Sequence, residues 1–143
     1  MTSAFDPRSV FLARHAQHVV LIHFPIALFL IGVLLDLISR VKPDARLATA
    51  AQVNLTAAAI CIIPAYLTGF LAWQFALDGQ RIHGLLLYHM GLASATMVLV
   101  ITCWWVRSRT QMQPVALIIL ELAGALSIAL TAHLGGFLSG VNS

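Results

Sequence analysis

The sequence predicts an all-α integral membrane protein: an antiparallel four-helix bundle with a short N-terminal segment at the membrane surface. Of 143 residues, 60 % are hydrophobic and only 9 % are charged, whereas a soluble domain carries about a quarter charged residues. Four apolar stretches are separable, at residues 18–39, 49–72, 83–105 and 114–138. Each is long enough to cross the hydrocarbon core as a helix, which needs about 20 residues. Together they use most of the chain, so we expect one membrane domain over residues 1–143.

Local signals place the first two spans. Asp6 and Pro7 predict the start of a short helix on the membrane surface, since proline is favoured in the first helical turn. Pro25 lies inside the first span and predicts a bend near His23, because proline lacks the backbone N–H. Asp44 predicts the N-cap of the second span. That span is rich in alanine, and small residues let membrane helices approach closely.

The second half of the chain shows similar signals. Asp78 and Gly79 predict a turn before the third span, and Pro114 opens the fourth span at a tolerated position. Five lysines and arginines flank the connections between spans 1 and 2 and between spans 3 and 4: Arg40, Lys42, Arg46, Arg107 and Arg109. The segments on the other side hold three. Basic residues favour the cytoplasmic side, so we expect a bacterial inner (cytoplasmic) membrane with both termini periplasmic.

The net charge of +3 is interpreted as this topology signal, and we expect a lipid bilayer rather than nucleic acid as the surroundings. The sequence contains no pattern of nucleophile, base and orienting residue, no phosphate-binding loop and no paired-carboxylate site. We therefore expect an electron-transfer or accessory protein rather than a stand-alone enzyme.

Histidines gather on the predicted periplasmic side. The six are His15, His18, His23, His83, His89 and His133. His23, His89 and His133 lie inside three different spans, each about 8–9 Å below the outer surface at 1.5 Å per residue. Ionisable residues inside spans are costly, and they usually face the bundle interior with a partner or a task. The simplest alternative is that each imidazole only makes a polar contact between helices.

A bound haem b is the cofactor that we expect from this layer. His23 and His89 lie on diagonal helices of an up-and-down bundle, where two imidazoles clamp an iron from opposite faces. His133 is then left to hydrogen-bond a haem propionate. Copper or zinc is the alternative, in a compact centre that uses all three histidines.

Two acidic residues lie in the cytoplasmic halves of the spans. Asp36 is four residues before Arg40, which predicts an ion pair on one helix face. Glu121 is deeper and has no cation near it in the sequence. We expect Glu121 to be protonated, or to bond to Asn54 or to another span.

Four sequence motifs resemble a widespread bacterial family of small four-span membrane proteins known as a domain of unknown function. They are HVVLIHFPIALF in span 1, PAYLTGFLAW ending span 2, YH in span 3 and the near-terminal LGG. The resemblance covers nearly the whole chain, and HFPIAL is its most specific part. It implies that His18, His23 and His89 are the functional histidines. It also implies a redox setting, since members are often linked to cytochrome c or Rieske domains.

The chain departs from the family pattern at three positions. Ala72 and Phe137 stand where the family commonly has acidic residues, and His133 is not part of the pattern. We therefore expect no role for acidic residues at these two positions, and His133 is a local addition of this chain.

These signals together predict a cytochrome b-like protein that passes electrons between a membrane donor, such as quinol, and an outer partner. That partner is expected to be a periplasmic cytochrome c or a larger redox complex. The main rival is a cofactor-free accessory or assembly subunit of a respiratory or photosynthetic complex. A third interpretation is a copper- or zinc-binding membrane protein. The sequence leaves the oligomeric state open, a homo-oligomer included.

Overall fold

The computed structural model describes residues 7–76, 79, 81–109 and 114–138, without the side chains of 7–17 and 76. These residues form four long helices: α1 (Pro7–Val41), α2 (Ala45–Ala76), α3 (Gly84–Arg109) and α4 (Pro114–Leu138). Each of the four is long and apolar enough to cross a membrane. The predicted all-α membrane bundle is confirmed.

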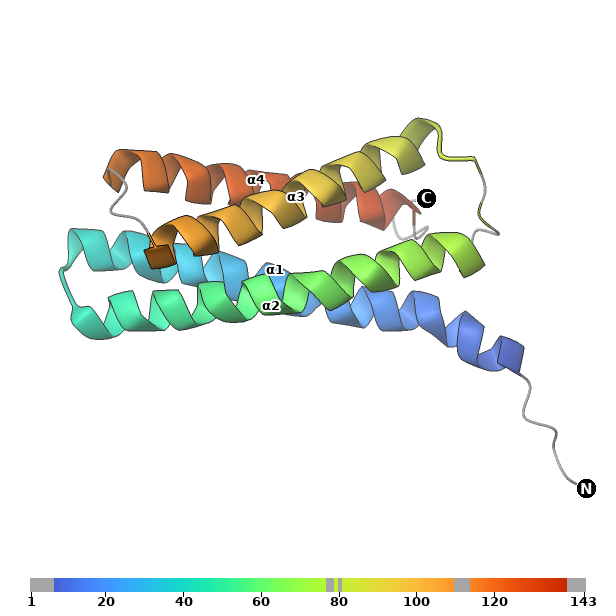
Figure 1. Ribbon diagram of the computed structural model, residues 1–143, viewed down its shortest axis with the longest axis horizontal. Coiled ribbons are helices and arrows are strands. Elements are labelled where there is room, and N and C mark those ends of the chain that lie inside the picture. Colours follow the sequence, from blue (N-terminus) through green and yellow to red (C-terminus); the bar gives the residue numbers. More distant parts are fainter. Residues whose placement is uncertain (1–6, 77–78, 80, 110–113, 139–143) are drawn as a thin grey trace, which may run out of the picture.

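The helices form two antiparallel hairpins, α1 with α2 and α3 with α4 (Figure 1). The pairs within each hairpin pack most extensively, and α2 against α3 makes the larger contact between hairpins. The start of α1, the end of α2, the start of α3 and the end of α4 lie at one end of the bundle. We call this the histidine end, after His18, His23, His89 and His133. The opposite end, with Arg40 and Arg107, is the arginine end.

The N-terminal segment and the first span are one continuous helix. α1 begins at Pro7, as predicted, and runs through Pro25 to Val41. The expected separate surface segment is thus joined to the span, because no proline or glycine interrupts residues 8–24. Pro25 is tolerated inside the helix, since membrane helices satisfy the freed carbonyl through neighbouring groups.

The connections follow their local signals. The backbone N–H of Arg46 donates to Asp44 Oδ1 at 2.8 Å, so the predicted N-cap of α2 is confirmed. Gly79 and Gly84 both have φ of +58°, a left-handed conformation that glycine adopts without steric cost. Gly84 begins α3, one residue later than expected, and Asp78 lies outside the described residues.

The core lies in the middle of the bundle and toward the arginine end. Phe29, Leu55 and Val100 are fully buried there. In α2 the buried residues are largely alanines, at positions 51, 58, 59, 65 and 72, as the close approach of small residues predicts. The described buried residues of α3 begin at Thr96 and those of α4 end at Ile128, so both helices reach the histidine end without buried side chains.

Hydroxyl groups bridge the helices in the middle of the bundle. Tyr66 of α2 and Ser94 of α3 are hydrogen-bonded at 2.8 Å. Thr96 of α3 meets Ser127 at 2.6 Å and Thr131 at 2.8 Å, both on α4. These bonds satisfy polar groups that would be costly in hydrocarbon, and they join α3 to both of its neighbours.

Candidate functional site

His18 packs inside the first hairpin. Its Nδ1 lies 3.1 Å from Thr68 Oγ1, and the Thr68 hydroxyl donates to the backbone carbonyls of Pro64 and Ala65. The hydroxyl oxygen therefore accepts from His18 Nδ1–H. Gly69 makes room for the ring, because a Cβ at this position would lie 2.9 Å from His18 Cε1.

His23 is exposed and points away from the buried side of α1. The buried positions of this helix include Pro25, Phe29 and Val33. At about 100° per residue, His23 lies roughly 160° around the helix from Pro25, whereas His18 lies within about 20° of it. His23 Nδ1 is 2.5 Å from the carbonyl oxygen of Val19. A carbonyl only accepts, so Nδ1 carries the proton and, in the neutral ring, Nε2 keeps its lone pair.

His89 packs inside the second hairpin, against α4. Its Nδ1 is buried and has no hydrogen-bond partner among the described residues. The ring also has a hydrogen-bonding interaction with the backbone of Thr131. A Cβ at Gly135 would lie 3.1 Å from His89 Cε1, so the glycine admits the imidazole. The result is a half-buried ring whose Nδ1 is unsatisfied within the described structure.

His133 is exposed on α4, one turn before Phe137. The two ring centroids are 4.8 Å apart in an edge-to-face arrangement. Beside this histidine lies a cavity of about 350 Å³ between α3 and α4, and its wall is almost entirely apolar. It is lined by Tyr88, Leu92, Leu130, His133 and Leu134.

The candidate histidines thus share one end of the bundle but occupy separate positions on it. Within the described part of the chain, no three His, Cys, Asp or Glu side chains lie close enough to hold a metal ion. The three-histidine centre expected as an alternative to haem is therefore not assembled there. The physical reason is the rotation of each helix about its axis, because His23 points outward from α1 while His89 packs against α4.

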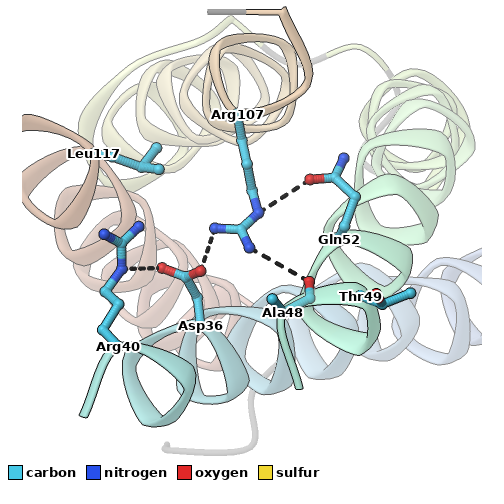
Figure 2. A pocket seen from close by; sticks show the side chains of 7 residues that line it. All are labelled: Asp36, Arg40, Ala48, Thr49, Gln52, Arg107 and Leu117. Atoms are coloured by element: carbon cyan, nitrogen blue, oxygen red, sulfur yellow. Dashed lines mark hydrogen bonds and ion pairs between the residues drawn. The ribbon is translucent and has the colours of Figure 1, made fainter. Parts of the chain in front are cut away.

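The arginine end holds a network of charges that joins all four helices. Asp36 is only 3 % exposed. Its Oδ2 accepts from Arg40 Nε at 2.5 Å, so the predicted ion pair within α1 is confirmed. Its Oδ1 accepts from Nη1 of Arg107, on α3 (Figure 2). Both oxygens of Asp36 are therefore bound by guanidinium groups.

Arg107 uses every nitrogen of its guanidinium group. Nε donates to Gln52 Oε1 at 3.0 Å, and Nη2 lies 3.5 Å from the carbonyl oxygen of Ala48, both on α2. Nη1 lies 3.5 Å from Glu121 Oε1 on α4 in addition to its bond with Asp36. One side chain of α3 thereby contacts the other three helices.

Glu121 is completely buried. Of the expected alternatives, the bond to Asn54 is not formed, because Asn54 Nδ2 donates to the carbonyl oxygen of Ala50 at 2.9 Å. The partner comes from another span, the third of the expected alternatives, and it is Arg107. Glu121 Oε2 has no hydrogen-bond partner in the described structure.

Arg107 is the site residue that the sequence does not predict, because its charge indicates only the topology of the connection between spans 3 and 4. Its position in the helical repeat held the relevant information. Thr96, Val100 and Cys103 are buried on α3, and Arg107 continues this spacing of three to four residues. A basic residue on the buried face of a membrane helix requires an anionic partner, and Asp36 and Glu121 were the available candidates.

Comparison with known proteins identifies one family. A family model described as "Predicted membrane protein (DUF2231)" matches residues 14–141, nearly the whole chain. No curated protein and no solved structure shows a significant match.

Proposed function

The chain belongs to the DUF2231 family of predicted membrane proteins, and for this member we propose electron transfer through a haem b held at the histidine end. The observation that carries the proposal is the Nδ1 of His89, which is buried and has no hydrogen-bond partner among the described residues. A buried polar atom without a partner is costly in an apolar setting. Coordination of iron would satisfy an imidazole nitrogen at this position.

The histidine end also offers space for an apolar group. The described part of α3 before Thr96 and of α4 after Ile128 contains no buried residue. Gly91 has nothing within 4 Å of the position that its Cβ would occupy. A porphyrin is largely apolar, so covering these surfaces would lower the free energy of the complex.

In this proposal α1 supplies the second ligand of the haem iron, and two of its histidines are candidates. The sequence pattern favours His23, whose hydrogen bond to Val19 leaves Nε2 available, as in many metal-binding histidines. The helical repeat favours His18, which lies on the same face as Pro25. We expect His18 to pair with His89, and His23 stays a prediction for the test to decide.

The bound haem would supply one-electron transfer at this end of the membrane. We propose quinol as the membrane donor, and the apolar cavity beside His133 supports this choice, since the imidazole offers a hydrogen bond to a ring hydroxyl. A periplasmic cytochrome c or a larger redox complex is the proposed acceptor. His133 is also available to bond a haem propionate.

The orientation that we propose is that of a bacterial inner membrane protein with both termini in the periplasm. The five basic residues flanking the α1–α2 and α3–α4 connections support it, because basic residues favour the cytoplasmic side. A cysteine placed at Lys42 should react with an impermeant reagent only after the inner membrane is permeabilised. Labelling of this cysteine in intact spheroplasts would place the α1–α2 connection in the periplasm and contradict the proposed orientation.

The proposal is tested by absorption spectroscopy of protein expressed with ample haem and purified in detergent. We expect sharp reduced α and Soret bands of a low-spin haem. His89→Ala should abolish these bands or convert them to a high-spin form. One of the two α1 variants, His18→Ala or His23→Ala, should have the same effect and thereby identify the second ligand. His83→Ala is the control, because His83 is exposed and precedes α3; its bands should be unchanged.

A colourless protein without haem would overturn the proposal. Copper or zinc found by elemental analysis would instead support the metal-binding alternative. A protein with neither would leave an accessory subunit, in which the histidines only make polar contacts between helices.

A further inference from the structure

The arginine end carries an open cavity that the haem proposal does not use. Its volume is about 510 Å³, within the range of small-molecule sites. All four helices line it (Figure 2). The lining residues are Asp36, Arg40, Ala48, Thr49, Gln52, Arg107 and Leu117.

The two arginines of this cavity differ in their remaining hydrogen-bonding capacity. The nitrogens of Arg107 all have acceptors within the bundle, so this residue forms part of the wall. Arg40 uses only its Nε, toward Asp36. Within the described part of the chain, its Nη1 and Nη2 have no hydrogen-bond or ion-pair partner. The Arg40 side chain is 25 % exposed, and Figure 2 shows its Nη atoms directed away from Asp36.

The charge around the free donors favours an anion. Asp36 is the acidic residue in the wall, and both of its oxygens already accept from guanidinium groups. Glu121 is fully buried behind the wall and does not line the cavity. Lys42 and Arg46 are exposed in the adjoining α1–α2 segment. Asp44 is also exposed in this segment, and its Oδ1 accepts from the backbone N–H of Arg46. With Lys42 and Arg46 against Asp44, a ligand at the Nη atoms of Arg40 still meets a net positive charge.

The position along the helix points to the source of the anion. The α1 span ends at Val41 and the α2 span begins at Ala45, so Arg40 lies where the hydrocarbon gives way to the headgroup layer. Basic pockets between membrane helices at this level bind phosphate headgroups. Two parallel N–H groups of an arginine match two phosphate oxygens in a bidentate pair.

We propose that this cavity binds the phosphate group of an anionic phospholipid through Nη1 and Nη2 of Arg40. Asp36 and Arg107 act as positioning residues: Asp36 holds Arg40 by its Nε, and Arg107 holds Asp36. The Thr49 hydroxyl donates to the Ala45 carbonyl at 2.8 Å, so its oxygen can accept a hydrogen bond from a hydroxyl of the headgroup glycerol of phosphatidylglycerol. The site is independent of the histidine end and of any haem bound there.

Native mass spectrometry of the detergent-solubilised full chain tests the proposal by titration with phosphatidylglycerol and, separately, phosphatidylcholine. We expect tighter binding of phosphatidylglycerol. Arg40→Gln should weaken it about tenfold, the effect of losing one bidentate charged pair. The matched control is Arg81→Gln, since Arg81 is exposed at the histidine end and its loss should leave the affinity unchanged.

Two further arms complete the test. Arg40→Lys keeps the charge but not the bidentate fork, so its affinity should lie between those of wild type and Arg40→Gln. Inorganic phosphate added to the wild type should compete with the lipid, because the proposed donors of Arg40 hold the phosphate group. An unchanged phosphatidylglycerol affinity at high phosphate concentration would count against this contact. Equal binding of both lipids by the wild type, or unchanged phosphatidylglycerol binding in a folded Arg40→Gln, would overturn the proposal.

Discussion

Replacing Arg107 by glutamine tests whether the arginine end holds the helices together. Arg107 is 12 % exposed, and its two acidic partners are 4 % and 0 % exposed at the side chain. The change leaves Glu121 buried without a cation and leaves Asp36 with Arg40 alone. Removing one partner of a buried ion pair lowers the free energy of unfolding by about 3–5 kcal/mol. The 3.5 Å separation of Arg107 and Glu121 gives a similar magnitude, about 5 kcal/mol at an effective dielectric constant of 20.

Reversible unfolding in mixed micelles measures this cost. Added dodecyl sulfate unfolds the protein, and tryptophan fluorescence reports the transition. Trp104 is well placed as a reporter, because its Nε1 donates to Thr56 Oγ1 at 3.1 Å between α3 and α2. We expect Arg107→Gln to lower the free energy of unfolding by about 3–5 kcal/mol. Arg109→Gln, at the exposed end of the same helix, should change it by less than about 0.5 kcal/mol.

A second substitution separates charge from packing. Adding Glu121→Gln to Arg107→Gln removes the uncompensated carboxylate, and we expect about 1–3 kcal/mol to be recovered. Equal stability of Arg107→Gln and Arg109→Gln would refute the reasoning. A double variant no more stable than Arg107→Gln would show that the loss comes from packing and not from the buried charge.

Two further predictions concern glycines at helix contacts. A Cβ at Gly124 would lie 2.7 Å from Cζ of the fully buried Phe29, so Gly124→Ala should lower the free energy of unfolding by about 1–3 kcal/mol. The control is Gly91→Ala, whose Cβ meets nothing within 4 Å. Equal thermal stability of these two variants would contradict the close contact of α1 and α4. Gly69→Leu should displace the His18 ring from Thr68 and lower the melting temperature in detergent, and an unchanged melt would place Gly69 against lipid instead.

The sequence by itself determined the membrane class, the number and approximate limits of the spans, the Asp44 cap and the Asp36–Arg40 pair. These features depend on residues close together in the chain: hydropathy adds up over about 20 residues, a cap acts within two or three, and the ion pair spans one helical turn. The sequence also predicts that the histidines lie at one end of the bundle, because antiparallel helices bring the start of one span beside the end of the next.

Only the tertiary structure decided which side chains face one another. Helix rotation turned His18 toward Thr68 and His23 outward, and it brought Arg107 to Asp36 and Glu121 across the bundle. Hydropathy does not indicate how each helix is rotated about its axis, because in a membrane span an apolar residue is stable both against lipid and against another helix. Rotation is set by close packing, such as Gly124 against Phe29, and by polar groups that must find partners in hydrocarbon. Such partners lie on other helices, so their identity appears only when the four spans are assembled.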